Sequence, residues 1–258
     1  MFRMNRERRR KIDLFWLLTK KELTLKYKRT TIGIFWSLLH PFLTTVVLFI
    51  AFKVFMRFEM ENYIFFLLCA LFPWNWFYTT VIMSTQALTN NVNLIKTTRF
   101  PIHFLIMATV FAQLINFLLA LLIIVGLSYI YGKGIGINYF LGIPILIVIQ
   151  LIVLTGASLA ISIVNVYFRD LEHIASVFLT MLFWLTPIIY PLELVPETYR
   201  IYVSINPLTH LVTAWRDLFM LGFINWNSVL VSFGSSVIFL LFGIIVFKKL
   251  KKNLYEIL

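Results

Sequence analysis

The chain has 258 residues, of which 60% are hydrophobic and 13% are charged, and its formal net charge is +12. Because a typical soluble domain carries about 25% charged residues, this composition excludes a water-soluble enzyme, a disordered chain and a secreted disulfide scaffold. The single cysteine, Cys69, excludes an internal disulfide and is interpreted as a packing residue. The composition predicts an integral membrane protein.

The basic residues gather at the two ends of the chain. Eleven of the 23 lysines and arginines lie between Arg3 and Arg29, and four more lie between Lys248 and Lys252. Basic tails around an apolar body are typical of segments held at an anionic membrane surface. A nucleic-acid-binding protein would instead place a basic face among recognition elements, so we expect the membrane, and no nucleic acid, as the partner of these charges.

The first predicted element is an amphipathic helix inside a cytoplasmic basic tail, residues 1–29. A 100° step per residue over 12–28 divides the helix into an apolar and a basic side. The apolar side holds Ile12, Phe15, Trp16, Leu23 and Tyr27, and the side that points away holds Lys21, Lys28 and Arg29. We expect this helix to lie in the membrane interface, either as an anchor whose lysines bind lipid head groups or as a lever that transmits force from a cytosolic partner.

Uncharged runs long enough to cross a bilayer follow the basic tail. About 20 helical residues span the hydrocarbon core of roughly 30 Å. Six runs meet this length within a transmembrane domain of residues 30–247, namely 30–52, 62–95, 100–132, 134–168, 174–192 and 218–247. They predict an all-α integral membrane protein with six transmembrane helices, followed by a cytoplasmic basic tail over 248–258.

The basic residues between these runs predict the orientation. With both termini inside, eighteen lysines and arginines lie on the cytoplasmic side, and five lie outside, namely Lys53, Arg57, Lys133, Arg200 and Arg216. Cytoplasmic loops of membrane proteins carry an excess of lysine and arginine. We therefore expect a multi-pass protein of the bacterial cytoplasmic membrane with both termini in the cytoplasm.

The segment 187–222 interrupts the pattern between the fifth and sixth runs. Four prolines break its helices, while charged and apolar residues alternate between them. Irregular backbone at membrane depth needs protein or water around it. We expect one or two short re-entrant gate helices that enter from the outer face, and an external loop with a surface amphipathic helix is the alternative.

Motifs for ATP hydrolysis, metal binding and ion coupling are absent from the sequence. No glycine-rich loop ends in Gly-Lys-Ser/Thr, so the chain is not expected to hydrolyse ATP itself. The four histidines, His40, His103, His173 and His210, are scattered, so we expect no metal site. None of the first four runs has a carboxylate well inside it, which gives little support to proton or sodium coupling.

Aromatic residues are the most abundant candidate functional groups, with 26 Phe, 11 Tyr and 7 Trp. Interfacial belts and helix packing explain many of them. Phe35 and Trp36 open the first run, however, and a dense cluster at 72–78 lies within the second. Flat rings inside a pore would give sugars a stacking surface with little directional preference, over which a polymer can slide.

Two connections on the cytoplasmic side, 90–101 and 165–172, are candidates for docking. The asparagine-rich start of the first, followed by Leu94 and Ile95, suits a short helix that rests on another protein. In the second, Arg169 and Asp170 stand beside aromatic residues, as in a docking surface. Solvated connecting loops are the alternative.

Several short segments, in this order, carry a resemblance to a known family. They are Thr31-Ile32-Gly33-Ile34-Phe35-Trp36 with Leu39-His40-Pro41, Phe72-Pro73-Trp74, Phe100-Pro101, Asn165-Val166-Tyr167-Phe168-Arg169-Asp170, Phe183-Trp184-Leu185-Thr186-Pro187-Ile188-Ile189-Tyr190 and Asn206-Pro207-Leu208. Together they closely resemble the membrane subunits of polysaccharide ABC exporters, the type 2 permeases that export O antigens, teichoic acids and capsule-type glycans. Two departures are Cys69-Ala70, where relatives often have Ser-Gly, and Tyr167, where Phe is common.

The resemblance implies a homodimer of six-span subunits with two copies of a separate ATPase subunit beneath it. The exported molecule would be a polysaccharide on an undecaprenyl-diphosphate carrier, moved through a channel between the two protomers. ATP and magnesium would belong to the ATPase partner. This chain would bind no cofactor or metal and would have no catalytic residue of its own.

The resemblance and the patterns above assign candidate residues to three roles. The substrate path would draw on Phe35, Trp36, Phe72, Trp74, Trp76, Phe77, Tyr78, Trp184 and Tyr190. Contact with the ATPase would use Lys20, Lys21, Asn91, Asn93, Lys96, Arg99, Arg169 and Asp170. The outer gate would use Pro187, Pro191, Glu193, Glu197, His210, Arg216 and Asp217.

Two alternative functions remain open at this point. One is a membrane enzyme that acts on lipid-linked sugar phosphates with Glu193, Glu197, His210, Arg216 and Asp217 as acid, base and phosphate-binding groups. The other is an ABC exporter of a small lipid or drug, which would not need so wide an aromatic path.

Overall fold

The computed structural model describes residues 2–28, 30–97, 100–131 and 136–254, with side chains from Arg8 onward. Arg29, Arg99 and Lys133 lie outside the described residues. All regular structure within those ranges is helical, as the sequence predicts. The helices are α1 (Phe2–Tyr27), α2 (Trp36–Phe49), α3 (Tyr63–Thr85), α4 (Val92–Thr97), α5 (His103–Ile130), α6 (Ile137–Tyr167), α7 (Leu171–Leu185), α8 (Glu197–Ile205), α9 (Pro207–Arg216) and α10 (Trp226–Leu250).

Five helical segments among the described residues are long and apolar enough to cross a membrane. They are Gly33–Phe55, Tyr63–Thr85, His103–Ile130, Ile137–Tyr167 and Trp226–Asn253. Each overlaps one of the predicted runs. Short 3₁₀ and π turns extend α2 and α10 at their ends, namely Gly33–Phe35, Ile50–Phe55 and Lys251–Asn253.

The predicted fifth span, 174–192, differs from the observed helix. α7 has 15 residues and ends at Leu185, which corresponds to about 22 Å of helix and falls short of a hydrocarbon core of about 30 Å. Its end has a local cause, because Thr186 precedes Pro187 and adopts the extended backbone that proline imposes on its neighbour. The prediction of six full-length spans is therefore not confirmed.

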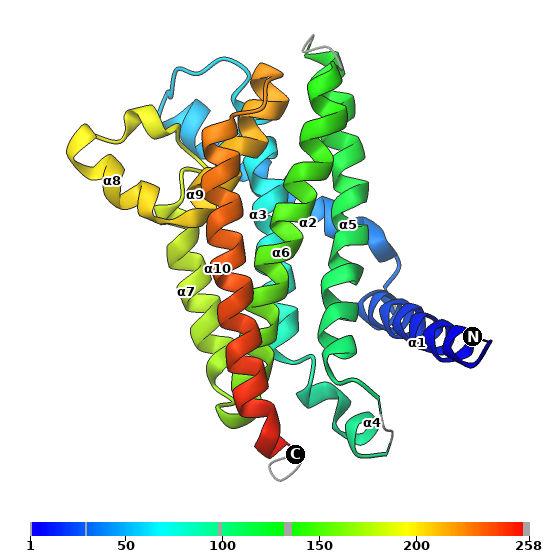
Figure 1. Cartoon of the computed structure of the whole chain (residues 1–258). Coiled ribbons are helices and arrows are strands. Elements are labelled where there is room, and N and C mark those ends of the chain that lie inside the picture. The colour runs from blue at the N-terminus through cyan, green and yellow to red at the C-terminus, as the bar shows by residue number, and fades with distance from the viewer. Residues whose placement is uncertain (1, 29, 98–99, 132–135, 255–258) are drawn as a thin grey trace.

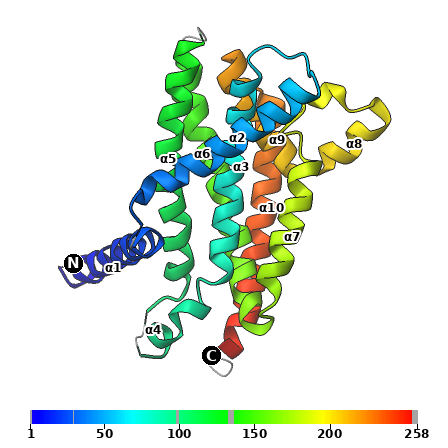
Figure 2. The ribbon, with the colours of Figure 1, turned by 180° about the vertical axis from the view of Figure 1, so that it is seen from behind.

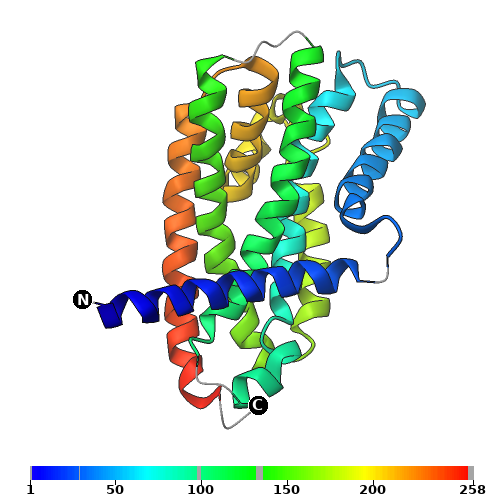
Figure 3. The same cartoon turned by 90° about the vertical axis from the view of Figure 1, so that its right-hand side faces the viewer.

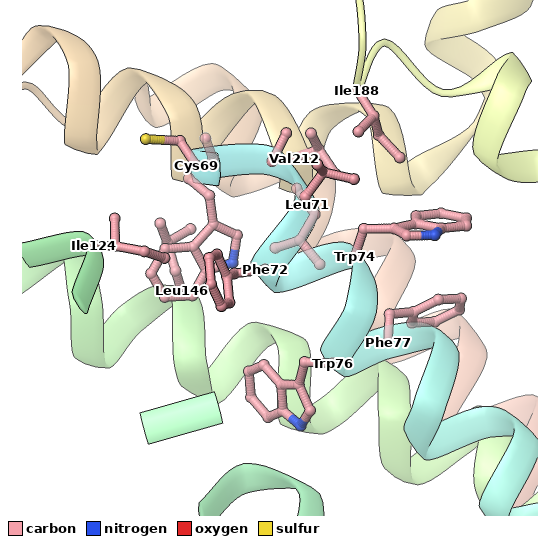
Figure 4. Packing of buried hydrophobic residues seen from close by; sticks show 14 of the residues in the cluster. Cys69, Leu71, Phe72, Trp74, Trp76, Phe77, Ile124, Leu146, Ile188 and Val212 are labelled. Carbon is pink, nitrogen blue, oxygen red and sulfur yellow. The ribbon is translucent and has the colours of Figure 1, made fainter. Parts of the chain in front are cut away.

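α3 occupies the centre of the bundle (Figure 1). It packs against α2, α5, α6, α7 and α9, and nearly every residue of its first half is buried. The surrounding core is rich in rings, and Figure 4 shows Phe72 and Trp76 on one side of α3 and Trp74 and Phe77 on the other. These five helices are thus positioned by the side chains of α3.

The N-terminal helix α1 lies across the bundle (Figure 3). It packs on α5, where Phe15 contacts the rings of Phe104 and Phe111. The predicted faces are only partly correct: Ile12 and Trp16 are about half exposed, and Lys21, which was expected to point away, donates a hydrogen bond to Asn91. One side of α1 therefore packs on α5, and the side with Ile12 and Trp16 is exposed.

α6 and α10 pack in backbone contact. Gly243 of α10 lies directly against the backbone of Gly156 of α6, so that a Cβ on Gly243 would overlap with the Gly156 carbonyl. Two buried serines of α10, Ser232 and Ser236, continue this narrow seam. Small residues allow backbones to approach in this way where lipid provides no hydrophobic driving force.

A buried amide ties three helices together beside Pro73. Gln150 of α6 donates to the Pro73 carbonyl of α3 over 2.8 Å and accepts from the Trp215 indole N–H of α9 over 2.8 Å. Gln150 is 1% exposed. An unpaired polar group in this position would be costly, so Gln150 fixes α9 relative to α3 and α6.

The Gly243 contact makes a stability prediction with a matched control in the same helix. Gly243→Ala should lower the thermal stability of the purified protein in detergent, because the added methyl forces α10 away from α6; overpacking of this kind costs about 1–3 kcal/mol. Gly234→Ala is the control, since nothing lies within 4 Å of its Cβ position, and it should leave stability unchanged or raise it slightly. Equal melting temperatures for the two variants would contradict the close crossing.

Candidate functional site

Two cavities of about 250 Å³ and 180 Å³ border the middle of α3. The first lies between α1, α2, α3 and α5, and the second lies between α2, α3 and α7. They share His40, Asn75 and Tyr78 and so form adjacent parts of one groove, here called the α2 groove. Figure 2 shows α2 crossing the front of the bundle with α7 beside α3.

The α2 groove combines aromatic rings with hydrogen-bonding side chains. Its rings are Trp36, Phe72, Trp74, Trp76, Tyr78, Phe117 and Phe183. Its polar lining consists of Lys26, Ser37, His40, Thr44, Asn75, Thr79, Gln113, Asn116 and Thr180.

The predicted substrate-path residues divide into two groups. Those that line the α2 groove are Trp36, Phe72, Trp74, Trp76 and Tyr78. Phe77 is buried against Trp74 instead, with ring centroids 5.9 Å apart. Phe35 and Trp184 are exposed outside it, and the Tyr190 hydroxyl donates to the Trp184 carbonyl over 3.2 Å.

A polar cluster at the end of the groove nearest α1 was not predicted from the sequence. Lys26 of α1 donates to the Gln113 side-chain oxygen of α5 over 2.8 Å. Asn116 donates to the same oxygen over 3.0 Å and accepts from the Tyr27 hydroxyl over 3.0 Å. Burial lowers the pKa of Lys26 to about 8, so the amine is still mostly protonated at neutral pH. The available signal was a pair of amides inside an otherwise apolar run.

Lys26 also lines a third cavity, of about 200 Å³, between α1 and the last turns of α3. Lys21, Glu22, Gln86 and Asn91 line it as well. Lys26 therefore lies between the α2 groove and this cavity, which is nearer to the end of the bundle that carries α4 and the chain's C-terminus (Figure 1).

The predicted ATPase-coupling residues gather toward that end of the bundle. Exposed side chains are Lys20 on α1, Asn93 and Lys96 on α4, and Arg169 and Asp170 between α6 and α7. Asn91 is buried, holds the Lys21 amine and donates to the Ala87 carbonyl. Gln86 joins the 90–101 connection to the 165–172 connection, because its side chain donates to Glu172 of α7 and accepts from Asn90.

The aromatic connection after α6 has a structural role as well. Tyr167 donates its hydroxyl to the Leu250 carbonyl at the end of α10 over 2.6 Å. This bond joins the end of α6 to the end of α10.

Arg216 is the buried centre of the predicted gate. It is 7% exposed, donates to the Pro187 and Ile188 carbonyls over 2.9 Å each, and lies 3.6 Å from the centre of the Phe66 ring. It thereby attaches the end of α9 to the turn after α7 and to α3.

The other predicted gate residues make separate contacts. Asp217 accepts from Asn225, and a ring nitrogen of His210 lies 2.9 Å from the Ser204 carbonyl. Glu193 and Glu197 are exposed, Pro191 precedes the short turn that holds Glu193, and Pro187 is buried. Glu193, Arg216 and Asp217 lie close enough to interact electrostatically. The described residues hold no group of three or more His, Cys, Asp or Glu side chains that could bind a metal.

Comparison with known proteins agrees with the resemblance found in the sequence. A family model described as ABC-2 type transporter matches residues 13–220. An O-antigen export system permease protein RfbA from Klebsiella pneumoniae is 33% identical over 246 residues, 95% of each chain. A protein of the same name from Myxococcus xanthus is 32% identical over 221 residues, 85% of each chain. The polysialic acid transport protein KpsM of Escherichia coli is 23% identical over 207 residues, 80% of each chain.

The family match runs from α1 to the turn that follows α9. It thus includes all residues of the α2 groove, both the 90–101 and 165–172 connections, and the predicted gate. The first relative is similar over nearly the whole length of both chains. The chain therefore belongs to the ABC-2 type transporter family.

Proposed function

We propose that this chain is the channel-forming membrane subunit of an ATP-driven exporter of lipid-linked polysaccharide, with ATP hydrolysed by a separate subunit. The observation that carries the proposal is the α2 groove. Aromatic rings and amide side chains line it together, beside α2, a helix with few buried residues. The O-antigen export permeases that resemble 95% and 85% of the chain support the same substrate class.

The chemistry of the α2 groove suits a glycan. Asn75 carries an amide donor and acceptor that match sugar hydroxyls, whereas Gln113 and Asn116 bond to Lys26 and Tyr27 at the edge of the groove. Trp36 and Tyr78 add flat faces for the C–H side of a sugar ring. Few charged groups line the groove, so a neutral polymer would be held weakly at each position and could advance.

The exposed faces beside the groove suit a second copy of the chain. In the apolar part of the span that contains α2, only 17% of the residues are buried, whereas 78% are buried in that of α3. α2 and α7 both border the groove, and both expose large apolar side chains such as Val47 and Phe178. A groove that contains His40 and Asn75 would be unfavourable against lipid, and a homodimer across α2 and α7 would close it into a channel.

Lys26 is the residue best placed to receive the carrier. A diphosphate on undecaprenol needs cationic donors, and Lys26 stands at the inner end of the α2 groove with Lys21 in the adjoining cavity. We propose that the diphosphate enters there. Both termini would then be cytoplasmic, in the inner membrane of a bacterium.

α7 offers a mechanical link between the ATPase and the outer gate. It begins directly after Arg169 and Asp170 and ends at the turn whose carbonyls Arg216 binds. Figure 1 shows α8 and α9 in the half of the bundle away from the C-terminus. We expect the ATPase dimer to hold ATP and magnesium and to displace α7. This displacement would move α9, which would act as a re-entrant gate helix.

Export should depend on Trp36. Trp36→Ala removes a ring that is 46% exposed at the α2 groove, and loss of a stacking contact of about 1 kcal/mol corresponds to roughly fivefold slower export. The measurement is surface glycan in cells whose own permease gene is deleted, with protein amount checked by blotting. Trp226→Ala is the control, because Trp226 is 57% exposed at the start of α10, outside the groove. Undiminished export by Trp36→Ala would count against the aromatic path.

The gate should depend on the planar fork of Arg216. Arg216→Lys keeps the charge but cannot bind two carbonyls and stack on Phe66 together, so stability in detergent should fall by about 1–3 kcal/mol and export should decrease. Arg200→Lys is the matched control, since Arg200 also donates to two carbonyls, those of Glu193 and Val195, but is partly exposed on α8. If both variants behave like the native chain, Arg216 does not hold the gate.

A further inference from the structure

A separate groove of about 410 Å³ lies between α5, α6 and α10. It is here called the α10 groove, and in Figure 1 its helices stand in front while α2 lies behind them. It is therefore not part of the α2 groove or of the proposed channel between α2 and α7.

The close crossing of α6 and α10 explains why this groove exists. α10 packs along α6 through Gly156 and Gly243 but shares few contacts with α5. The space left between α5 and α10 is walled by apolar side chains, among them Met107 of α5, Leu159 of α6 and Ile244 of α10. Its volume falls within the range of roughly 300–1,000 Å³ that is usual for small-molecule sites.

One end of the α10 groove is basic. His103 of α5 lines it together with Lys248 and Lys251, which lie three residues apart and therefore on one face of the helix. Among the residues that the structure describes, neither lysine side chain has a hydrogen bond or an ion pair. Two neighbouring lysines, Lys249 and Lys252, are exposed and do not line the groove.

The α10 groove thus combines a basic end with an apolar trough, the two features that a phospholipid site needs. Basic pockets between transmembrane helices on the cytoplasmic side of a membrane bind anionic head groups, and a trough of apolar side chains suits an acyl chain. We propose that the α10 groove binds one anionic phospholipid of the inner leaflet, with its phosphate on Lys248 and Lys251 beside His103 and an acyl chain along Met107, Leu159 and Ile244. The lipid would join α5 to α10, two helices that otherwise touch little.

The experiment compares lipids that differ only in head group. The full chain is purified in detergent, and dioleoyl phosphatidylglycerol or dioleoyl phosphatidylcholine is added while bound lipid is measured by native mass spectrometry and melting by a thermal-shift assay. Phosphatidylglycerol should remain bound and raise the melting temperature, because a ligand that binds only the folded form stabilises it. Phosphatidylcholine should do neither.

A charge-matched pair of variants tests the site itself. Lys248→Gln with Lys251→Gln should weaken phosphatidylglycerol binding on the order of thirtyfold, which is what two lysines near an anionic surface contribute. Lys249→Gln with Lys252→Gln removes the same charge from the same helix end and should bind as the native chain does. Should the first pair fail to fold, Ile244→Trp fills the apolar trough without touching the lysines and should reduce binding as well.

Four results would overturn the proposal. Equal losses in the two double variants would show a diffuse charge effect. Equal binding of phosphatidylcholine would remove the head-group specificity, and a full melting shift with glycerol 1-phosphate alone would show a site for a free anion. Loss of ATPase co-purification from the Lys248 and Lys251 variant, with lipid binding unchanged, would assign the basic end to the partner protein.

Discussion

Burial of α3 is the constraint on which the other elements depend. At the middle of α3, Gln150 of α6 donates to the Pro73 carbonyl and accepts from Trp215 of α9, so a buried polar side chain joins three helices. Arg216 adds a second link, because it reaches both the Phe66 ring and the turn after α7. α9 and the turn after α7 are therefore held against α3.

The two sides of the bundle are built differently, and this difference separates their roles. On one side, Gly156 and Gly243 bring α6 and α10 into backbone contact and leave a groove next to α5. On the other side, α2 covers α3 loosely and leaves a groove lined by rings and amides. A closed, small-residue seam suits a face turned to lipid, whereas a polar groove beside an open helix suits a face that another protein covers.

Much of the fold could be predicted from the sequence, because uncharged runs of sufficient length mark five helical segments that are long and apolar enough to cross a membrane. The length of α7 could not be read from such a run, since a count of charges ignores the effect of Pro187 on the residue before it. The aromatic part of the α2 groove was found from the cluster at 72–78. The sequence did not indicate four polar residues whose roles arise from contacts between helices far apart in sequence, namely Lys26, Gln113, Asn116 and Gln150. The faces of α1 were only partly predicted, because one part of its surface packs on α5 and another part is exposed.

The claim that α2 faces a second copy of the chain is tested most directly by cysteine cross-linking in native membranes. In a Cys69→Ala background, Val47→Cys on α2 and Leu122→Cys on α5 place thiols at positions that are 64% and 70% exposed in the single chain. The account predicts that a short bifunctional thiol reagent gives a dimer band with Val47→Cys and none with Leu122→Cys. A dimer through Leu122→Cys, with none through Val47→Cys, would contradict it.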